Sequence, residues 1–176
     1  MVNYRRARVP GVCYFLTLTL KDRRRDLLVR YQDELRLSLR QTMARLPFRL
    51  PAAVILPDHL HMLIELPAAD SDFSSRVRRL KSGFVSLLRE RPGAGLVFNS
   101  KGESNVWQPR FWEHMIRDDR DYAAHVDYIH FNPVKHGLVS VVRDWPLSSF
   151  HRFVEQGLLP PDWAGGAETD VVGAGE

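Results

Sequence analysis

The chain has 176 residues, of which 44% are hydrophobic and 26% are charged, with a formal net charge of +4. This composition is ordinary for a soluble globular protein and predicts one domain with a sizeable core. The single cysteine excludes an internal disulfide and fits a reducing cytoplasm. No segment is apolar over the length of a membrane span, and the first residues lack the apolar region of a signal peptide, so we expect no membrane partner.

The charge is distributed unevenly along the chain. Residues 1–50 contain twelve Lys or Arg against four Asp or Glu, whereas residues 155–176 contain five acids and neither Lys nor Arg. A basic front half predicts a polyanionic partner, because Lys and Arg contacts to phosphates displace condensed counterions. A solvated surface with uneven charge would give the same counts, so charge alone leaves both interpretations open.

The first half of the chain predicts three strands and two helices. Residues 12–20, 48–56 and 59–66 are apolar stretches that favour strands. Leucine and methionine recur at helical spacing over residues 32–46. A second helix is expected from about residue 72 to residue 92. Its predicted inner face consists of apolar residues at helical spacing, namely Phe73, Val77, Leu80, Phe84 and Leu87.

The second half predicts a loop, a further strand and a third helix. Residues 93–105 are rich in glycine and polar residues and favour a flexible loop, and the aromatic-rich residues 106–116 favour a strand or hairpin. The third helix is expected over residues 118–132, where a proline and then a glycine end it. We expect residues 1–163 to form one domain and residues 164–176 to be a disordered acidic tail. The order β-α-β-β-α-β-α predicts an α+β fold with helices on one face of an antiparallel sheet.

Two histidines lie close together on the predicted strand of residues 59–66. Side chains on a strand alternate between faces, so His59 and His61 project from one side while the apolar residues between and after them face the other. Two imidazoles held side by side on a rigid sheet provide half of a metal site. The alternative is a pair of partly exposed histidines with no ligand.

The third helix carries a tyrosine and an asparagine one turn apart. At about 100° per residue, Tyr122, Val126 and Ile129 form the apolar stripe. Tyr128 falls off that stripe, and Asn132 follows one turn later. A tyrosine away from the buried face, followed by an amide, is poorly explained by core packing. The alternative is a surface tyrosine that makes an i,i+4 contact.

The two pairs of residues together favour phosphoryl transfer. Two imidazoles and one amide oxygen suit a divalent ion that must grip a phosphate. A phenol near such an ion can attack phosphorus as phenolate, which gives a covalent phosphotyrosine and a free 3′-hydroxyl. The bond energy is then stored in the enzyme-linked intermediate, and the DNA ends can be rejoined without ATP.

Three sequence blocks resemble a known family. They are Leu-Pro-Asp-His-Leu-His at residues 56–61, Trp-Gln-Pro-Arg-Phe-Trp-Glu-His at residues 107–114, and Asp-Tyr-Ile-His-Phe-Asn-Pro-Val-Lys-His-Gly at residues 127–137. In this order and spacing the blocks resemble the REP-associated tyrosine transposases, which are bacterial single-tyrosine members of the HUH nuclease superfamily. The resemblance runs from about residue 4 to residue 163.

This resemblance implies a ferredoxin-like (RRM-like) HUH nuclease fold and a Mg²⁺ or Mn²⁺ site formed by His59 and His61, with Asn132 as third ligand. It implies Tyr128 as the nucleophile that cleaves single-stranded DNA through a 5′-phosphotyrosine. The implied substrate is a repetitive extragenic palindrome (REP), a hairpin with a tetranucleotide at its 5′ foot. The implied setting is the cytoplasm of a bacterium, associated with the nucleoid, with the protein acting as a monomer or homodimer.

The resemblance also points to basic residues that would contact DNA. An N-terminal arm with Arg5 and Arg6 would help to read the tetranucleotide. Arg110 and Lys135 lie inside the matching blocks and would neutralise phosphates near the cut. Four cations of the second helix would follow the hairpin phosphates: Arg76, Arg78, Arg79 and Lys81. A solvated or structural role is the alternative for each of them.

Two other functions stay open from the residues. A non-catalytic module that binds single-stranded nucleic acid would use the same sheet architecture. A zinc hydrolase would use the His-x-His pair, although no third His, Asp or Glu stands at a familiar zinc spacing.

Overall fold

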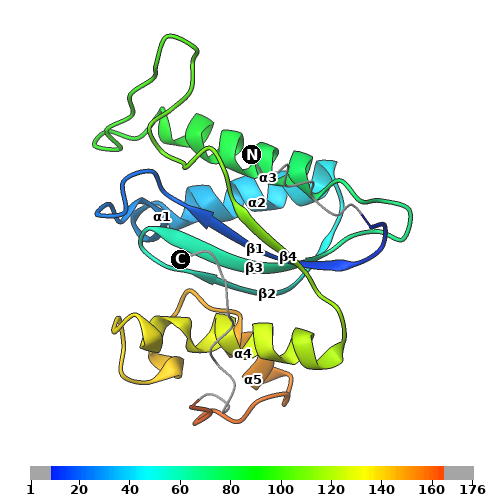
Figure 1. Ribbon diagram of the computed structural model, residues 1–176. Coiled ribbons are helices and arrows are strands. Elements are labelled where there is room, and N and C mark those ends of the chain that lie inside the picture. The colour runs from blue at the N-terminus through cyan, green and yellow to red at the C-terminus, as the bar shows by residue number, and fades with distance from the viewer. Residues whose placement is uncertain (1–8, 165–176) are drawn as a thin grey trace, which may run out of the picture.

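A four-stranded antiparallel sheet lies between two helical layers in this computed structural model, which describes residues 9–164 (Figure 1). The strand order is β2-β3-β1-β4, so β3 and β1 are central. The strands are β1 Cys13–Thr19, β2 Arg49–Ile55, β3 His59–Glu65 and β4 Trp112–Met115. The helices are α1 Leu27–Arg30, α2 Gln32–Arg45, α3 Phe73–Leu88, α4 Asp119–Lys135, the 3₁₀ turn η1 Val142–Asp144 and α5 Phe150–Glu155.

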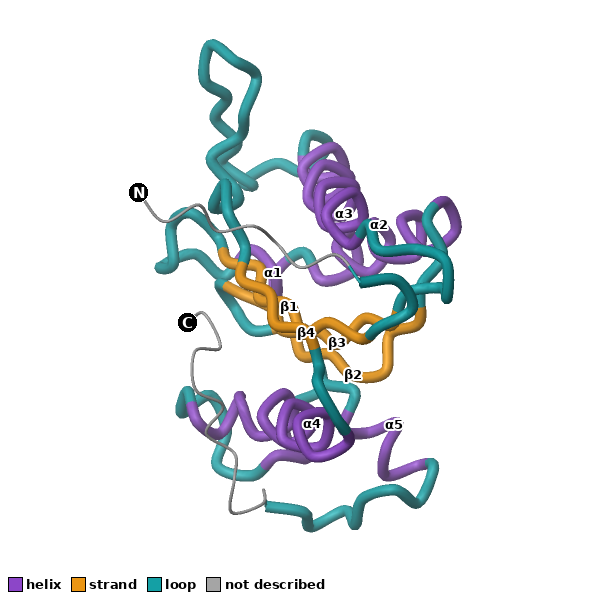
Figure 2. Tube along the Cα trace, turned by 45° about the vertical axis from the view of Figure 1, so that its right-hand side comes forward, coloured by secondary structure: helices purple, strands orange, loops and turns teal. Residues whose placement is uncertain are grey.

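The predicted α+β class and the antiparallel sheet are confirmed. Helices α2 and α3 pack together on one face, as expected for a ferredoxin-like order of elements. The opposite face is covered by α4, which contacts β2 and β3, with α5 beside it (Figure 2). The sheet is therefore buried on both sides, and each face contributes to a different core.

Strand β3 shows how the alternation of side chains divides these two cores. Leu60, Met62 and Ile64 are buried toward α2 and α3. His59 and His61 alternate with them and point to the other face, where Leu63 packs with residues of α4. The prediction that the two histidines share a face opposite the main core is thus confirmed.

Helix α3 begins where the sequence predicted. The carboxylate of Asp72 accepts a hydrogen bond from the backbone N–H of Ser75 at 3.0 Å and so caps the first turn. Four of the five apolar residues predicted for the inner face are buried, but Leu87 is only half-buried and Leu88 is buried in its place. Leu88 lies four residues after Phe84, which keeps it on the same stripe.

Helix α4 runs past the proline that was expected to end it. Pro133 lies in the last turn, and although it has no backbone N–H to donate, the helix continues to Lys135. Gly137, at φ +67°, then ends it. The N–H of Gly137 donates to the carbonyl of Val134, and the N–H of Leu138 donates to that of Pro133, each at 2.9 Å. This pair of bonds is a Schellman motif.

Helix α4 is also buried on more than one side, which corrects the single apolar stripe expected from the sequence. It lies between the sheet and the segment of η1 and α5. His130 is fully buried, and its Nε2 is 2.9 Å from the hydroxyl of Ser149 just before α5. Tyr128 is 1% exposed, although it lies off the stripe of Val126 and Ile129.

Two of the predictions concern the ends of the chain. The predicted acidic tail from residue 164 falls almost wholly outside the described residues, as do Arg5 and Arg6. Among the helices of residues 9–164, none combines the length and apolar character needed to cross a bilayer.

Candidate active site

His59 and His61 are buried and lie edge to face, with their ring centroids 4.9 Å apart. The Nδ1 atom of His59 is 2.7 Å from a carboxylate oxygen of Asp58, and the Nδ1 atom of His61 is 2.8 Å from the hydroxyl of Thr17 on β1. The second contact follows from the register of the sheet, which places Thr17 directly opposite His61. Both rings are thus held by their Nδ1 atoms.

This arrangement fits a divalent cation. A carboxylate can only accept a proton from His59 Nδ1, so the lone pair of that imidazole lies on Nε2. The Nε2 atom of His59 is buried and has no hydrogen-bond partner among the described residues. Metal-binding histidines usually donate their other ring N–H to a carboxylate or another oxygen, as His59 does here. An ion would satisfy the otherwise unpaired nitrogen.

The carboxylate of Asp58 is charged in this environment. Burial raises its pKa, but the hydrogen bonds from His59 and Arg23 outweigh burial and hold the pKa well below its ordinary value. Arg23 Nε lies 2.6 Å from this carboxylate. At neutral pH Asp58 is therefore an anion that orients the ring of His59. This favours the tautomer of His59 with its proton on Nδ1 over the one with its proton on Nε2.

The structure brings Tyr128 to the histidine pair. Its ring centroid is 5.2 Å from that of His61, in an edge-to-face contact, and 5.9 Å from that of Phe15. The ammonium group of Lys135, two turns later on α4, lies 4.8 Å from the tyrosine ring centroid. Asn132 lies one turn after Tyr128 and is fully buried. A phenol, two imidazoles and a cation are thus gathered on one side of the sheet.

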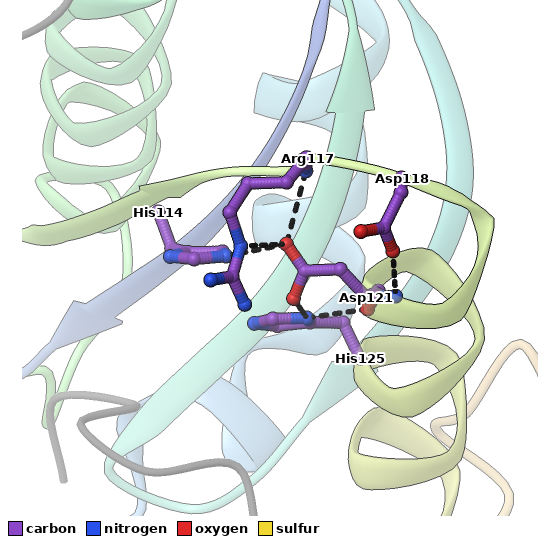
Figure 3. Close-up of polar contacts among 5 residues, drawn as sticks. All are labelled: His114, Arg117, Asp118, Asp121 and His125. Atoms are coloured by element: carbon purple, nitrogen blue, oxygen red, sulfur yellow. Dashed lines mark hydrogen bonds and ion pairs between the residues drawn. The ribbon is translucent and has the colours of Figure 1, made fainter.

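A second cluster beside this site was not found from the sequence. His114 of β4 and Arg117 both contact Oδ2 of Asp121, at 2.8 and 3.1 Å, and His125 Nδ1 lies 3.2 Å from Oδ1 (Figure 3). The sequence signal for this cluster was the i,i+4 spacing of Asp121 and His125 on α4. His114 comes from another element, and only the packing of β4 against α4 reveals it.

This cluster also offers three ligand atoms within 4.8 Å of one another, from His114, Asp121 and His125. It is therefore a second candidate for a cation. Here, however, the carboxylate already pairs with the guanidinium of Arg117, and His125 Nδ1 lies 2.7 Å from the backbone carbonyl of Asp121. The nitrogen of His125 that faces the carboxylate is thus a proton donor, so the cluster is better suited to support α4.

Asp121→Asn is expected to destabilise the fold by about 1–3 kcal/mol, because it weakens charge-assisted hydrogen bonds in a buried setting. Burial raises the pKa of Asp121, but the bonds from Arg117 and His114 hold it well below its ordinary value. A depressed pKa stabilises the fold above the unfolded value of about 3.9, and this contribution is lost as the pH falls through the folded value. Urea unfolding at pH 7 and at pH 3 measures both effects.

Asp119→Asn is the matched control, because Asp119 is exposed in the same helical turn. It should cost less than about 1 kcal/mol through the helix dipole alone. Equal losses for the two variants would show that the cluster around Asp121 contributes nothing specific.

The predicted DNA-contacting cations differ in their exposure. Arg78, Arg79, Arg110 and Lys135 are exposed. Arg76 is 3% exposed, and its guanidinium contacts the Asp70 carboxylate and two backbone carbonyls, so it fastens α3 inside the protein. Lys81 is half-buried, and its ammonium donates to the Gln108 carbonyl at 2.9 Å.

Comparison with known proteins identifies the family. The family described as "Transposase IS200 like" matches residues 9–132. A REP-associated tyrosine transposase of Escherichia coli is 46% identical over 94% of this chain and 92% of that protein. The chain belongs to the REP-associated tyrosine transposases. A Haemophilus influenzae relative of this family is 46% identical over 98% of the chain and 99% of its own length.

A solved structure of the same family agrees with this fold over nearly its whole length. It is described as a REP-associated tyrosine transposase bound to a REP hairpin, and its TM-score to this chain is 0.88 at 44% identity, covering 100% of this chain and 98% of that one. The chain is accordingly a member of a family of DNA-processing enzymes. The buried histidine pair and Tyr128 lie within the part that the family match covers.

Proposed function

We propose that this protein is a transposase-type endonuclease and strand transferase that cleaves single-stranded DNA at REP hairpins, with Tyr128 as nucleophile. The observation that carries the proposal is the contact between Tyr128 and His61, whose ring centroids are 5.2 Å apart in the interior of the protein. A core packing role alone would not require a phenol beside two imidazoles and a lysine. The hairpin substrate is inferred from the related transposase bound to a REP hairpin.

In this proposal His59, His61 and Asn132 hold a divalent ion, Mg²⁺ or Mn²⁺. When bound, the ion would spread the charge that develops on the non-bridging phosphate oxygens. Asp58 and Thr17 fix the orientation of the two imidazoles through their Nδ1 atoms. The phenol oxygen of Tyr128 gives up its proton and bonds to phosphorus, the bond from phosphorus to the 3′-oxygen breaks, and that oxygen takes up a proton.

Lys135 has two tasks in the proposed reaction. Its ammonium lies over the ring of Tyr128, where it attracts the substrate phosphate and favours negative charge on the phenol oxygen. Tyr128 is only 1% exposed, so a phosphate reaches it only after a covering group moves. The exposed, flexible side chain of Lys135 is the group that we expect to move when DNA binds.

Exposed cations on the α3 side of the sheet would bind the rest of the DNA. Arg78, Arg79 and Arg110 are available for phosphates, and the N-terminal Arg5 and Arg6 remain candidates for reading the tetranucleotide. Arg76 is left out of this set because its guanidinium is used inside the fold. Lys81 would contribute mainly through its long-range field, since its ammonium binds backbone carbonyls.

The proposal is tested by incubating the protein with Mn²⁺ or Mg²⁺ and a labelled single-stranded REP hairpin, followed by denaturing electrophoresis. The expected product is a labelled band at the mass of the protein plus a DNA fragment, together with a released strand that ends in a 3′-hydroxyl. Binding of the hairpin with neither product would instead support a non-catalytic single-stranded nucleic-acid-binding module on the same fold.

A further inference from the structure

A groove lies on the far side of the sheet from Tyr128, between α3 and the long connection of residues 93–111. It has a volume of about 730 Å³. Its outer wall is the protruding loop beside α3, in which Phe98 and Ser104 pair as an antiparallel bridge (Figures 1 and 2). Its inner wall is α3, and its floor includes Trp107. The candidate active site uses none of these residues.

The charge of the groove favours an anion. Five of its lining residues are basic and one is acidic, and they are Lys21, Arg78, Lys81, Arg89, Arg110 and Glu103. A concave surface lined by one sign of charge focuses its field into the cavity. An anionic ligand therefore gains from several cations at once.

The groove also carries an exposed aromatic ring. Phe98 is 37% exposed, and the guanidinium carbon of Arg89 lies 4.5 Å from the centroid of its ring. A planar ring backed by a guanidinium is a platform on which a nucleobase can stack. The charged residues and this platform together match a ligand that has both phosphates and flat rings.

Lys81 makes the groove wall rigid. Its ammonium donates to the carbonyls of Gln108 and Arg110 and lies 5.6–5.8 Å from the ring centroids of Trp107 and Phe111. In the opposite direction, the indole N–H of Trp107 donates to the backbone carbonyl of Lys81 at 3.2 Å. Both the side-chain ammonium and the backbone carbonyl of Lys81 thus bind the connection to α3. These bonds hold the groove in shape without a ligand.

The size of the groove selects between paired and unpaired DNA. A volume of this size lies within the range of about 300–1,000 Å³ that holds small ligands. One or two nucleotides fit such a space, whereas a duplex keeps its bases stacked inside and cannot present them to Phe98. The lining residues 107–111 run directly into β4, the edge strand of the sheet.

We propose that this groove is a second DNA site, which binds one or two unpaired nucleotides of the substrate by stacking a base on Phe98 and pairing phosphates with Arg78 and Arg110. The inference rests on the proposed function for the nature of the ligand, because a family that processes DNA meets unpaired strands. It does not depend on the chemistry at Tyr128. The groove would hold the strand that flanks the hairpin and so add to the choice of cleavage position.

The test measures binding of an unstructured eight-nucleotide DNA strand, labelled with a fluorophore, to the full chain carrying Tyr128→Phe so that no cleavage intervenes. Phe98→Ala should weaken binding about tenfold or more, because stacking of a base on an aromatic ring is lost. Phe98→Trp should keep the affinity, and its indole fluorescence should be quenched by the strand. Phe98 is exposed, so folding is expected to survive both changes.

Arg110→Ala should weaken binding and lower the slope of log K against log salt by about 0.7. Arg40→Ala is the matched control, because Arg40 is an exposed arginine of α2 outside the groove. Leu158→Ala is the control for loss of exposed apolar surface, since Leu158 is 62% exposed in the C-terminal segment. Neither control should change the affinity by more than about twofold.

Three results would overturn the groove proposal. The first is an unchanged affinity in Phe98→Ala, and the second is equal losses in Arg110→Ala and Arg40→Ala. The third is equal displacement of the strand by a ten-residue polyglutamate peptide from the Tyr128→Phe protein with and without Phe98→Ala. That result would show that the groove recognises charge alone. Absence of a covalent adduct between the unmodified protein and a REP hairpin, with intact binding of the short strand, would contradict the proposed reaction and leave the groove standing.

Discussion

Tyr128→Phe is expected to abolish the covalent protein–DNA adduct and to lower cleavage of a REP hairpin by about a thousandfold or more, because the nucleophile is gone. The ring that packs against His61 and Phe15 is kept, so the fold and the affinity for the hairpin should change little. Denaturing electrophoresis measures the adduct, and fluorescence anisotropy measures the affinity for the same hairpin.

Tyr122→Phe is the matched control for this variant. Tyr122 lies on the same helix six residues before Tyr128 and is half-buried against the core cluster that contains Phe15 and Leu63. It should cleave at the rate of the unmodified protein. An adduct that persists in Tyr128→Phe would place the nucleophile elsewhere, and loss of the adduct in both variants would point to a general disturbance of α4.

His59→Gln is expected to remove binding of Mn²⁺ and to lower cleavage by a factor of about 10²–10³, the range for loss of an electrostatic contribution in a catalytic site. Glutamine keeps much of the side-chain volume of histidine, and its amide N–H can still donate to Asp58. The carboxylate of Asp58 therefore keeps a hydrogen-bond donor. Isothermal titration with Mn²⁺ measures the ion directly, without reference to activity.

Thermal unfolding gives a second measurement of the same site. At an Mn²⁺ concentration of about 100 times Kd, binding to the native state alone adds about 2.7 kcal/mol, which for a domain of this size raises Tm by about 5–10 °C. The shift should be absent in His59→Gln, while both proteins should unfold at similar temperatures without the ion.

His125→Gln separates the two candidate ion sites. If the ion binds to His59 and His61, this variant should keep the Mn²⁺-dependent rise in Tm, although its starting stability should fall through the loss of contacts with Phe15 and His114. If the rise disappears in His125→Gln and persists in His59→Gln, the ion belongs to the cluster around Asp121, and the assignment of His59 as a ligand is wrong.

Much of the fold and part of the site follow from local sequence pattern. The pairing of His59 with His61 on one face follows from the period of a strand, and the order of strands and helices follows from alternating apolar stretches. Asn132 lies one turn after Tyr128 by the period of a helix. The three sequence blocks added the family, which the comparisons confirm.

Other features could not be read from local pattern. Tyr128 was expected on an exposed face because a single stripe was assumed for the helix, yet α4 is enclosed by the sheet on one side and by η1 and α5 on the other. Arg76 looked like one cation in a basic row, but the carbonyl of Pro47 and the carboxylate of Asp70 bury it. Each outcome depends on elements that are distant in the chain.

The sequence by itself therefore determined which residue types recur on which face of each strand and helix, because those periods are set by bonds and hydrogen bonds between near neighbours. Only the tertiary structure decided that Thr17 meets His61, that His114 and Arg117 share the carboxylate of Asp121, and that residues 93–111 form a groove with α3. These contacts arise when separate elements bury their apolar surfaces together, and that packing has no signal in a local stretch of sequence.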